Sequence, residues 1–195
     1  MTFVLCAGSS ASDRLGSVPP RSTEGHDWIR KRVLALAWEG PVRVLEIGPG
    51  SGACGRALAG AGVSRLSAVE ISARNVEKHR LDEIYDAVLV GDARTLDWPD
   101  ADVVILGDLT EHLGARQARD MWDHAAAVAR RAVYLVLSVD HDPRHLEEFA
   151  RMPFHPGPGW DHLAVLGELP DIGDWWLGEE VGVYERRTDR ARHPV

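Results

Sequence analysis

The chain has 195 residues, of which 45% are hydrophobic and 27% are charged, an ordinary balance for a globular protein. This length supports one sizeable hydrophobic core rather than two full domains. No apolar stretch approaches the ~20 residues that a membrane-spanning helix needs. The two cysteines, Cys6 and Cys54, are too few for a disulfide framework or a thiolate zinc site. We therefore expect a single-domain cytoplasmic protein with reduced thiols and no membrane partner.

The net charge is −8, and the positive charge is unevenly placed. The last eleven residues hold four arginines against two acids, so the rest of the chain is more acidic than the whole. Because phosphate neutralisation by Lys and Arg dominates nucleic-acid affinity, this balance argues against nucleic acid as a partner. We assign residues 1–21 to a flexible N-terminal segment, residues 22–187 to the domain, and residues 188–195 to a basic, solvated tail.

Helical and strand-like patterns alternate along the domain. Apolar side chains recur at helical spacing from Ser22 to Trp38, and Gly40-Pro41 ends this pattern. Further helices are predicted over Ala53–Ala61, Ser72–Leu81, with Ser72 as N-cap, and Ala115–Arg131. Short apolar runs predict strands over Val42–Ile47, Leu66–Ile71, Ala87–Val90, Val103–Leu106, Val133–Val139, Ile172–Leu177 and Val181–Arg186.

This order predicts an α/β fold. Strands that alternate with helices form right-handed βαβ units, which place helices on both faces of a parallel sheet. The last two strands are separated only by Gly178-Glu-Glu180, and a link this short makes an antiparallel hairpin. We expect a doubly wound, mostly parallel seven-stranded sheet with an antiparallel C-terminal hairpin strand.

The strongest motif joins the first strand to the second helix, in Val44-Leu-Glu-Ile-Gly48-Pro-Gly50-Ser-Gly52. Glycine permits positive φ and a close approach of ligand to backbone. The following helix start supplies unpaired N–H donors. A tight turn would need only one or two glycines, so three at alternate positions favour a nucleotide-like ligand.

The glycines also match the dinucleotide pattern G-x-G-x-x-G through Gly50, Gly52 and Gly55, which leaves an NAD-dependent oxidoreductase as an alternative. Two features weigh against it. Gly48, not Gly50, ends the strand, so the pattern falls two residues late. Glu46 places a carboxylate in an otherwise apolar strand, which is costly unless it serves a ligand, and a cationic ligand would justify it.

Acidic residues follow the next two strands. Glu70 ends the second strand, 20 residues after Gly50, where a carboxylate accepts hydrogen bonds from ribose hydroxyls. Asp92 follows the third strand and could accept a bond from an adenine amino group, with the N–H of Ala93 directed at the ring. Alternatively, Asp92 closes an Asx turn.

The segment from Val44 to Gly52 resembles the first motif of the class I S-adenosylmethionine-dependent methyltransferases, [V/I/L]-L-[D/E]-[V/I/L]-G-x-G-x-G. The order of elements from Ser22 to Arg186 is also similar to theirs. The resemblance implies S-adenosylmethionine as cofactor, with Glu46 near the methionine amino group, Glu70 on the ribose, and Asp92 and Ala93 on the adenine. The full implied set is Glu46, Gly48, Gly50, Gly52, Glu70, Ile71, Asp92, Ala93 and Asp108.

The methyl acceptor is expected beyond the fourth strand, in Gly107-Asp-Leu-Thr-Glu-His-Leu113, because ligands of open α/β sheets bind beyond the carboxyl ends of strands. Glu111 and His112 are the candidate catalytic residues, with His112 as the base because its pKa lies near neutrality. Alternatively, both residues merely cap the next helix. A small-molecule acceptor is expected, with O-methylation slightly ahead of N-methylation.

Asp108-x-x-Glu111-His112 also resembles the E-x-x-E-H motif of two metal-using groups, the small-RNA 2′-O-methyltransferases and the ubiquinone-pathway O-methyltransferases. The RNA group adds a histidine in an Asp-His pair, which Asp161-His162 matches. A divalent metal held by Asp108, Glu111, His112 and His162 is therefore an alternative. We do not favour it, because Asp108 is one methylene shorter than the expected Glu.

The His- and Pro-rich stretch from 140 to 160 is either a lid over the acceptor or a plain surface excursion. A non-catalytic nucleotide-binding module that keeps the fold without the chemistry is a further alternative to an enzyme.

Overall fold

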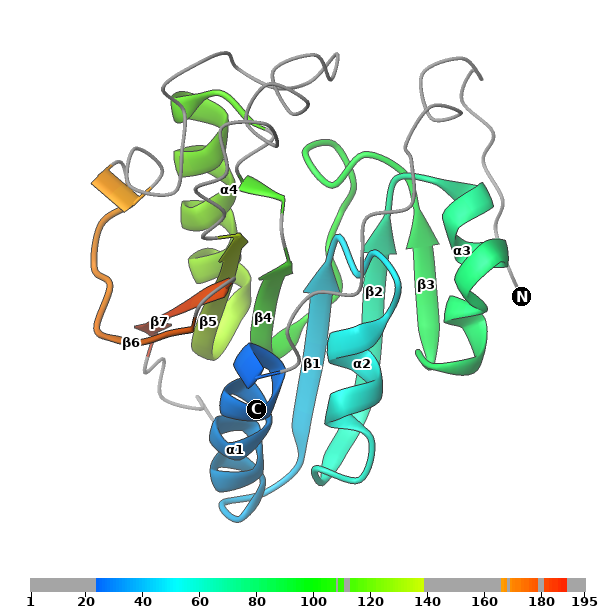
Figure 1. The fold of residues 1–195 in the computed structure, drawn as a ribbon, viewed down its shortest axis with the longest axis horizontal. Helices are drawn as coiled ribbons and strands as arrows, with labels where there is room; N and C mark the ends of the chain where they lie inside the picture. The colour runs from blue at the N-terminus through cyan, green and yellow to red at the C-terminus, as the bar shows by residue number, and fades with distance from the viewer. Residues whose placement is uncertain are drawn as a thin grey trace.

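The computed structural model describes residues 24–107, 109–110, 113–138, 166–167, 169–178 and 181–188. Seven strands form one sheet in the order β3-β2-β1-β4-β5-β7-β6 (Figure 1). The helices are α1 (Glu24–Ala37), α2 (Ala53–Leu58), α3 (Ala73–His79), the 3-10 helix η2 (Leu81–Glu83) and α4 (Ala115–Val128). The strands are β1 (Val42–Ile47), β2 (Val63–Glu70), β3 (Ala87–Val90), β4 (Ala101–Gly107), β5 (Ala129–Ser138), β6 (Asp174–Leu177) and β7 (Val181–Arg187).

Strands β1 to β5 run parallel, and β7 pairs antiparallel with both β5 and β6. The predicted fold class is therefore confirmed, including the terminal antiparallel hairpin. The proposed segment 1–21 lies outside the described residues, as does the proposed tail 188–195 apart from Thr188, so the domain boundaries remain predictions. No helix in the described ranges is both long and apolar enough to cross a membrane.

Most element boundaries agree with the sequence patterns, and β1 and β3 match at both ends. The largest difference is at β5, which begins at Ala129, whereas the helical pattern predicted a helix to Arg131. Ala129 pairs with Ala101 of β4, so strand pairing ends α4 at Val128 although its periodicity continues. Ser72 is the N-cap of α3, as predicted, with its Oγ accepting a bond from the Asn75 amide at 3.2 Å.

Two apolar clusters pack against opposite faces of the sheet. One joins alternate β1 residues Leu45 and Ile47 to Trp122 of α4. The other joins Val42 and Val44 to the side that carries α1 and α2. This alternation places Glu46 on the α2 side, in line with Val42 and Val44. In Figure 1, the arrowheads of β1 to β4 all point to the same edge of the sheet, above α1 and α2.

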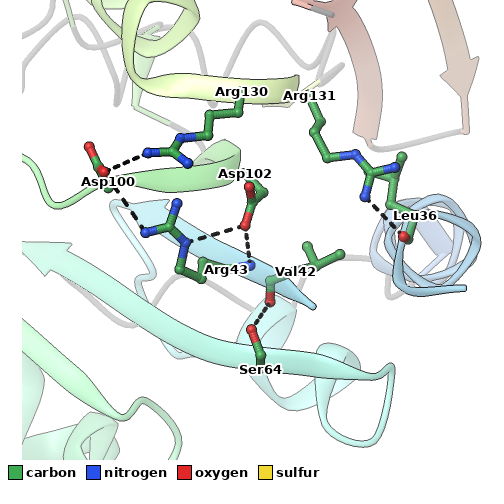
Figure 2. A network of polar contacts seen from close by, with 8 residues as sticks. All are labelled: Leu36, Val42, Arg43, Ser64, Asp100, Asp102, Arg130 and Arg131. Atoms are coloured by element: carbon green, nitrogen blue, oxygen red, sulfur yellow. Dashed lines mark hydrogen bonds and ion pairs between the residues drawn. The ribbon is translucent and has the colours of Figure 1, made fainter. Parts of the chain in front are cut away.

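Polar contacts fasten the opposite edge, where the strands begin (Figure 2). Asp102 of β4 is buried, and its Oδ2 accepts bonds from the Arg43 amide at 2.9 Å and from Arg43 Nε at 3.3 Å. Arg130 of β5 donates to Asp100 at 2.8 Å, and Arg131 donates to the Leu36 carbonyl at the end of α1 at 3.0 Å. These contacts tie α1, β1, β4 and β5 together, far from the carboxyl ends of the strands.

Replacing Asp102 by Ala should destabilise the fold without changing the residues at the carboxyl ends of the strands. The Arg43 amide would lose its acceptor, and a buried donor without a partner costs about 1–3 kcal/mol. We expect urea unfolding to show a loss of that size in the free energy of unfolding. Asp97→Ala, at an exposed position nearby, is the control and should change it by less than about 0.5 kcal/mol. Equal effects of the two changes would contradict this role of Asp102.

Candidate functional site at the carboxyl ends of the strands

The glycine loop after β1 has a positive φ at each of its three alternate glycines, 72° at Gly48, 54° at Gly50 and 77° at Gly52, a conformation that other residues rarely adopt. The reasons differ between positions. A Cβ at Gly52 would lie 2.7 Å from Ile84 Cδ1 and 2.9 Å from Leu81 Cδ2, so these side-chain ends would have to shift, and the positive φ favours glycine there as well. A Cβ at Gly50 would meet no atom of the described chain within 4 Å. Gly50 therefore presents bare backbone to open space, where a ligand can approach.

Glu70 lies at the end of β2, next to this loop, and is buried. Its Oε1 accepts a bond from the Ser72 amide at 2.9 Å, and its Oε2 accepts one from Asn75 Nδ2 at 3.1 Å. Burial raises the pKa of Glu70 above its ordinary value, while these hydrogen bonds oppose that rise. The carboxylate is thus held in one orientation at the sheet edge.

Asn75 was not singled out from the sequence, although it belongs to this site. Its Nδ2 also donates to the Gly50 carbonyl at 3.0 Å, so one amide joins the glycine loop to Glu70. The only sequence signal was its position three residues after the N-cap Ser72 in the first turn of α3. That position predicts a helix start and says nothing about where the side chain reaches.

Asp92 adopts the Asx turn that the sequence left open. Its Oδ1 accepts a bond from the Arg94 amide at 2.9 Å, and the Arg94 guanidinium pairs with the same carboxylate. These bonds from Arg94 hold the pKa of Asp92 below its ordinary value. The loop is anchored by Trp98 Nε1, which donates to the Ala93 carbonyl at 2.9 Å. A role of Asp92 and Ala93 toward adenine remains a prediction.

Among the described acids of the predicted set, Glu46 is the most deeply buried, with 2% of its surface exposed. The hydroxyl of Tyr85 donates to Glu46 Oε2 at 2.7 Å. Burial raises the pKa of Glu46 to about 7, and the Tyr85 hydrogen bond acts against this rise. A cation placed beside this carboxyl group would lower its pKa, so that the group loses its proton near neutral pH.

Strand pairing gathers these residues at one edge. In register, Ile47 faces Val69 of β2 and Leu106 of β4, so Gly48, Glu70 and Gly107 follow at one level. Ile71, next to Glu70, is 67% exposed and offers an apolar surface there. Eight of the predicted cofactor residues are described, and each lies in the last residues of β1 or β2 or in the segments that follow β1, β2 and β3: Glu46, Gly48, Gly50, Gly52, Glu70, Ile71, Asp92 and Ala93.

The predicted catalytic residues Glu111 and His112 lie outside the described residues, as do Asp108 and His162 and the stretch from 140 to 160. The metal alternative therefore stays a prediction that we do not favour. Within the described ranges, no group of three or more His, Cys, Asp or Glu side chains could hold a metal ion.

Comparisons with known proteins agree with this fold. A family model described as a methyltransferase domain matches residues 45–137, from β1 to β5. No curated protein matches the chain.

Many solved structures share the fold. Magnesium protoporphyrin IX methyltransferase from Synechocystis PCC 6803, with bound SAH, aligns with a TM-score of 0.58 at 19% identity over 84% of each chain. An O-methyltransferase family protein from Burkholderia thailandensis aligns with a TM-score of 0.61 at 16% identity, over 87% of this chain and 57% of that one. The N-methyltransferase NodS from Bradyrhizobium japonicum WM9 aligns with a TM-score of 0.56 at 15% identity, over 84% of this chain and 96% of that one.

The raised pKa of Glu46 predicts how stability depends on pH. Between the ordinary value of 4.5 and about 7, the folded protein holds a proton that the unfolded chain has released. Stability is therefore lost as pH rises through this window, by up to about 3 kcal/mol from this group. Glu46→Gln removes the titration, so its stability relative to the parent should increase from pH 5 to pH 8 in urea unfolding of the ligand-free proteins. A difference that does not change with pH would refute the assignment.

Proposed function

We propose that this member of the class I S-adenosylmethionine-dependent methyltransferases transfers the methyl group to a small-molecule acceptor, at oxygen in preference to nitrogen. The observation that carries the proposal is the cluster formed by Glu46, Gly50 and Glu70 at the carboxyl ends of β1 and β2. An open glycine backbone between two buried carboxylates suits a ligand with a ribose and a positive charge.

Each described residue of the cluster has a part that fits this cofactor. The Glu70 carboxylate, held by Ser72 and Asn75, would accept bonds from the ribose hydroxyls. The exposed side chain of Ile71 would cover an aromatic ring such as adenine. Glu46 would face the methionine ammonium group, which offsets the cost of its burial. When bound, S-adenosylmethionine supplies a methyl group on a positively charged sulfur.

The acceptor is proposed to bind beyond β4, close to the same edge. There His112 would take the proton of an acceptor hydroxyl, and Glu111 would assist it; both assignments rest on the sequence. Oxygen is preferred because a base such as His112 serves a hydroxyl acceptor, which is a weak nucleophile until its proton is removed. A neutral amine is nucleophilic without a base. Alignment of acceptor and methyl group would supply the remainder of the catalysis.

The acidic composition supports a small molecule rather than nucleic acid as the partner. Cys54 is a free, buried thiol, which fits the cytoplasmic location that we include in the proposal.

Cofactor binding is tested by thermal stability. A ligand that binds only the folded state adds about 2.7 kcal/mol at a hundredfold excess over Kd. S-adenosylmethionine and S-adenosylhomocysteine should raise Tm, whereas NAD should not. Glu70→Ala should weaken S-adenosylhomocysteine binding about tenfold or more, because charge-assisted bonds to the ribose are lost. Glu77→Ala, at an exposed position of α3, should bind as the parent does. A Tm shift with NAD alone would instead support an oxidoreductase.

Catalysis is tested with a panel of hydroxyl and amine compounds, using mass spectrometry to detect the methylated product. With an acceptor in hand, His112→Ala should lower kcat by about 10²–10⁴-fold while cofactor binding persists. EDTA should leave the rate unchanged. Loss of turnover with EDTA and recovery with Mn²⁺ or Mg²⁺ would favour the metal-assisted alternative. Full activity of His112→Ala would reject His112 as the base, and catalysis would then depend on the alignment of acceptor and methyl group.

A further inference from the structure

A tyrosine that follows η2 reaches across to β1 beneath the glycine loop. Tyr85 is buried, and its hydroxyl lies 2.7 Å from Glu46 Oε2, although the two residues are 39 positions apart. The other carboxylate oxygen, Oε1, faces the end of β4, since a Cβ on Gly107 would lie 3.6 Å from it. Glu46 therefore has one oxygen fixed by Tyr85 and the other directed toward the edge where the cofactor is proposed to bind.

Gly55 in α2 makes this contact possible. A Cβ at Gly55 would lie 2.4 Å from the Tyr85 hydroxyl oxygen and 2.5 Å from its Cζ, distances that no side chain tolerates. The third glycine of the apparent dinucleotide pattern is thus explained by the packing of Tyr85 rather than by a ligand. Glycine at position 55 lowers the helix propensity of α2, but it leaves the space that the Tyr85 hydroxyl needs to reach Glu46.

The surroundings of Glu46 give its carboxylate little other support. Tyr85 and, from α2, the buried Cys54 are the titratable groups of the described chain that interact with it. Burial and the nearby Glu46 carboxylate raise the pKa of both groups, so each stays neutral near pH 7. No ion pair found among the described residues involves Glu46. Among the described residues, the Tyr85 hydroxyl is thus the hydrogen-bond donor that stabilises the charged carboxylate.

We propose that Tyr85 is a positioning residue of the cofactor site, which holds the Glu46 carboxyl group in place and favours its charged form, so that binding of a cofactor ammonium group expels a proton and weakens in acid. This inference rests on the proposed function. A bound cation favours the charged carboxylate, so binding is accompanied by release of the proton that Glu46 holds in the free protein. Affinity is then full above the pKa of free Glu46, near 7, and falls by up to tenfold per pH unit below it.

The test is calorimetric binding of S-adenosylhomocysteine between pH 5.5 and 8.5, in buffers of different ionisation enthalpy, which reports affinity and proton release together. The parent should bind more weakly below pH 7 and release up to one proton there. Tyr85→Phe should bind about threefold to tenfold more weakly at pH 7, with its fall in affinity displaced to higher pH, because the carboxylate loses its donor. Glu46→Gln should bind weakly at every pH, without this dependence.

Tyr134→Phe is the matched control. Tyr134 is equally buried in the same apolar cluster, and its hydroxyl has no hydrogen-bond partner among the described residues. This variant should keep the parental pH profile.

A Tyr85→Phe profile that coincides with that of the parent would overturn the proposal, as would parental binding that does not vary with pH. If Tyr85→Phe fails to fold, Glu46→Gln decides, because a parental pH profile in that variant excludes Glu46 as the titrating group. Absence of S-adenosylhomocysteine binding at every pH would instead overturn the proposed function, and the inference with it.

Discussion

Parallel pairing of β1 with β2 on one side and β4 on the other is the constraint on which the site depends. Because these strands run in the same direction, the residues that follow them must emerge at one edge of the sheet. The chain continues from β1 toward β2 and β3 in one direction and toward β4 and β5 in the other, and such a reversal of order leaves room for a ligand. Glu46, Gly50 and Glu70 meet there, although 24 positions separate the two acids.

The two ends of the sheet show different balances between stability and function. At the amino ends, the buried Asp102 carboxylate pairs with Arg43, so burial of its charge is compensated within the protein. The exposed Asp100 carboxylate pairs with Arg43 and Arg130 beside it. At the carboxyl ends, Glu46 and Glu70 are buried with hydrogen-bond donors but without an ion-pair partner among the described residues, and burial raises the pKa of both. Burial of a carboxylate without a cation partner lowers the stability of the free protein, and a positively charged ligand bound beside it would offset that loss.

The connection between α3 and β3 contributes more to the site than its irregular sequence indicates. Leu81 and Ile84 pack against Gly52, and Tyr85 packs against Gly55 and bonds to Glu46. Gly52 of the loop and Gly55 of α2 therefore pack closely against this connection, whereas a Cβ at Gly50 would meet no atom of the described chain within 4 Å. A glycine motif can thus combine positions that a ligand requires with positions that the protein interior requires.

The sequence by itself determined the fold class, nearly all element positions and the acids at the strand ends, because apolar periodicity and glycine spacing are local signals. It also placed Ser72 as an N-cap, from the chemistry of helix starts. It did not reveal Asn75 or Tyr85, whose partners lie 25 and 39 residues away. It left open whether Asp92 forms an Asx turn, and it did not predict that β5 begins at Ala129. Those features depend on which strands lie side by side, and only the tertiary structure brings Tyr85 to Glu46 and Asn75 to Gly50.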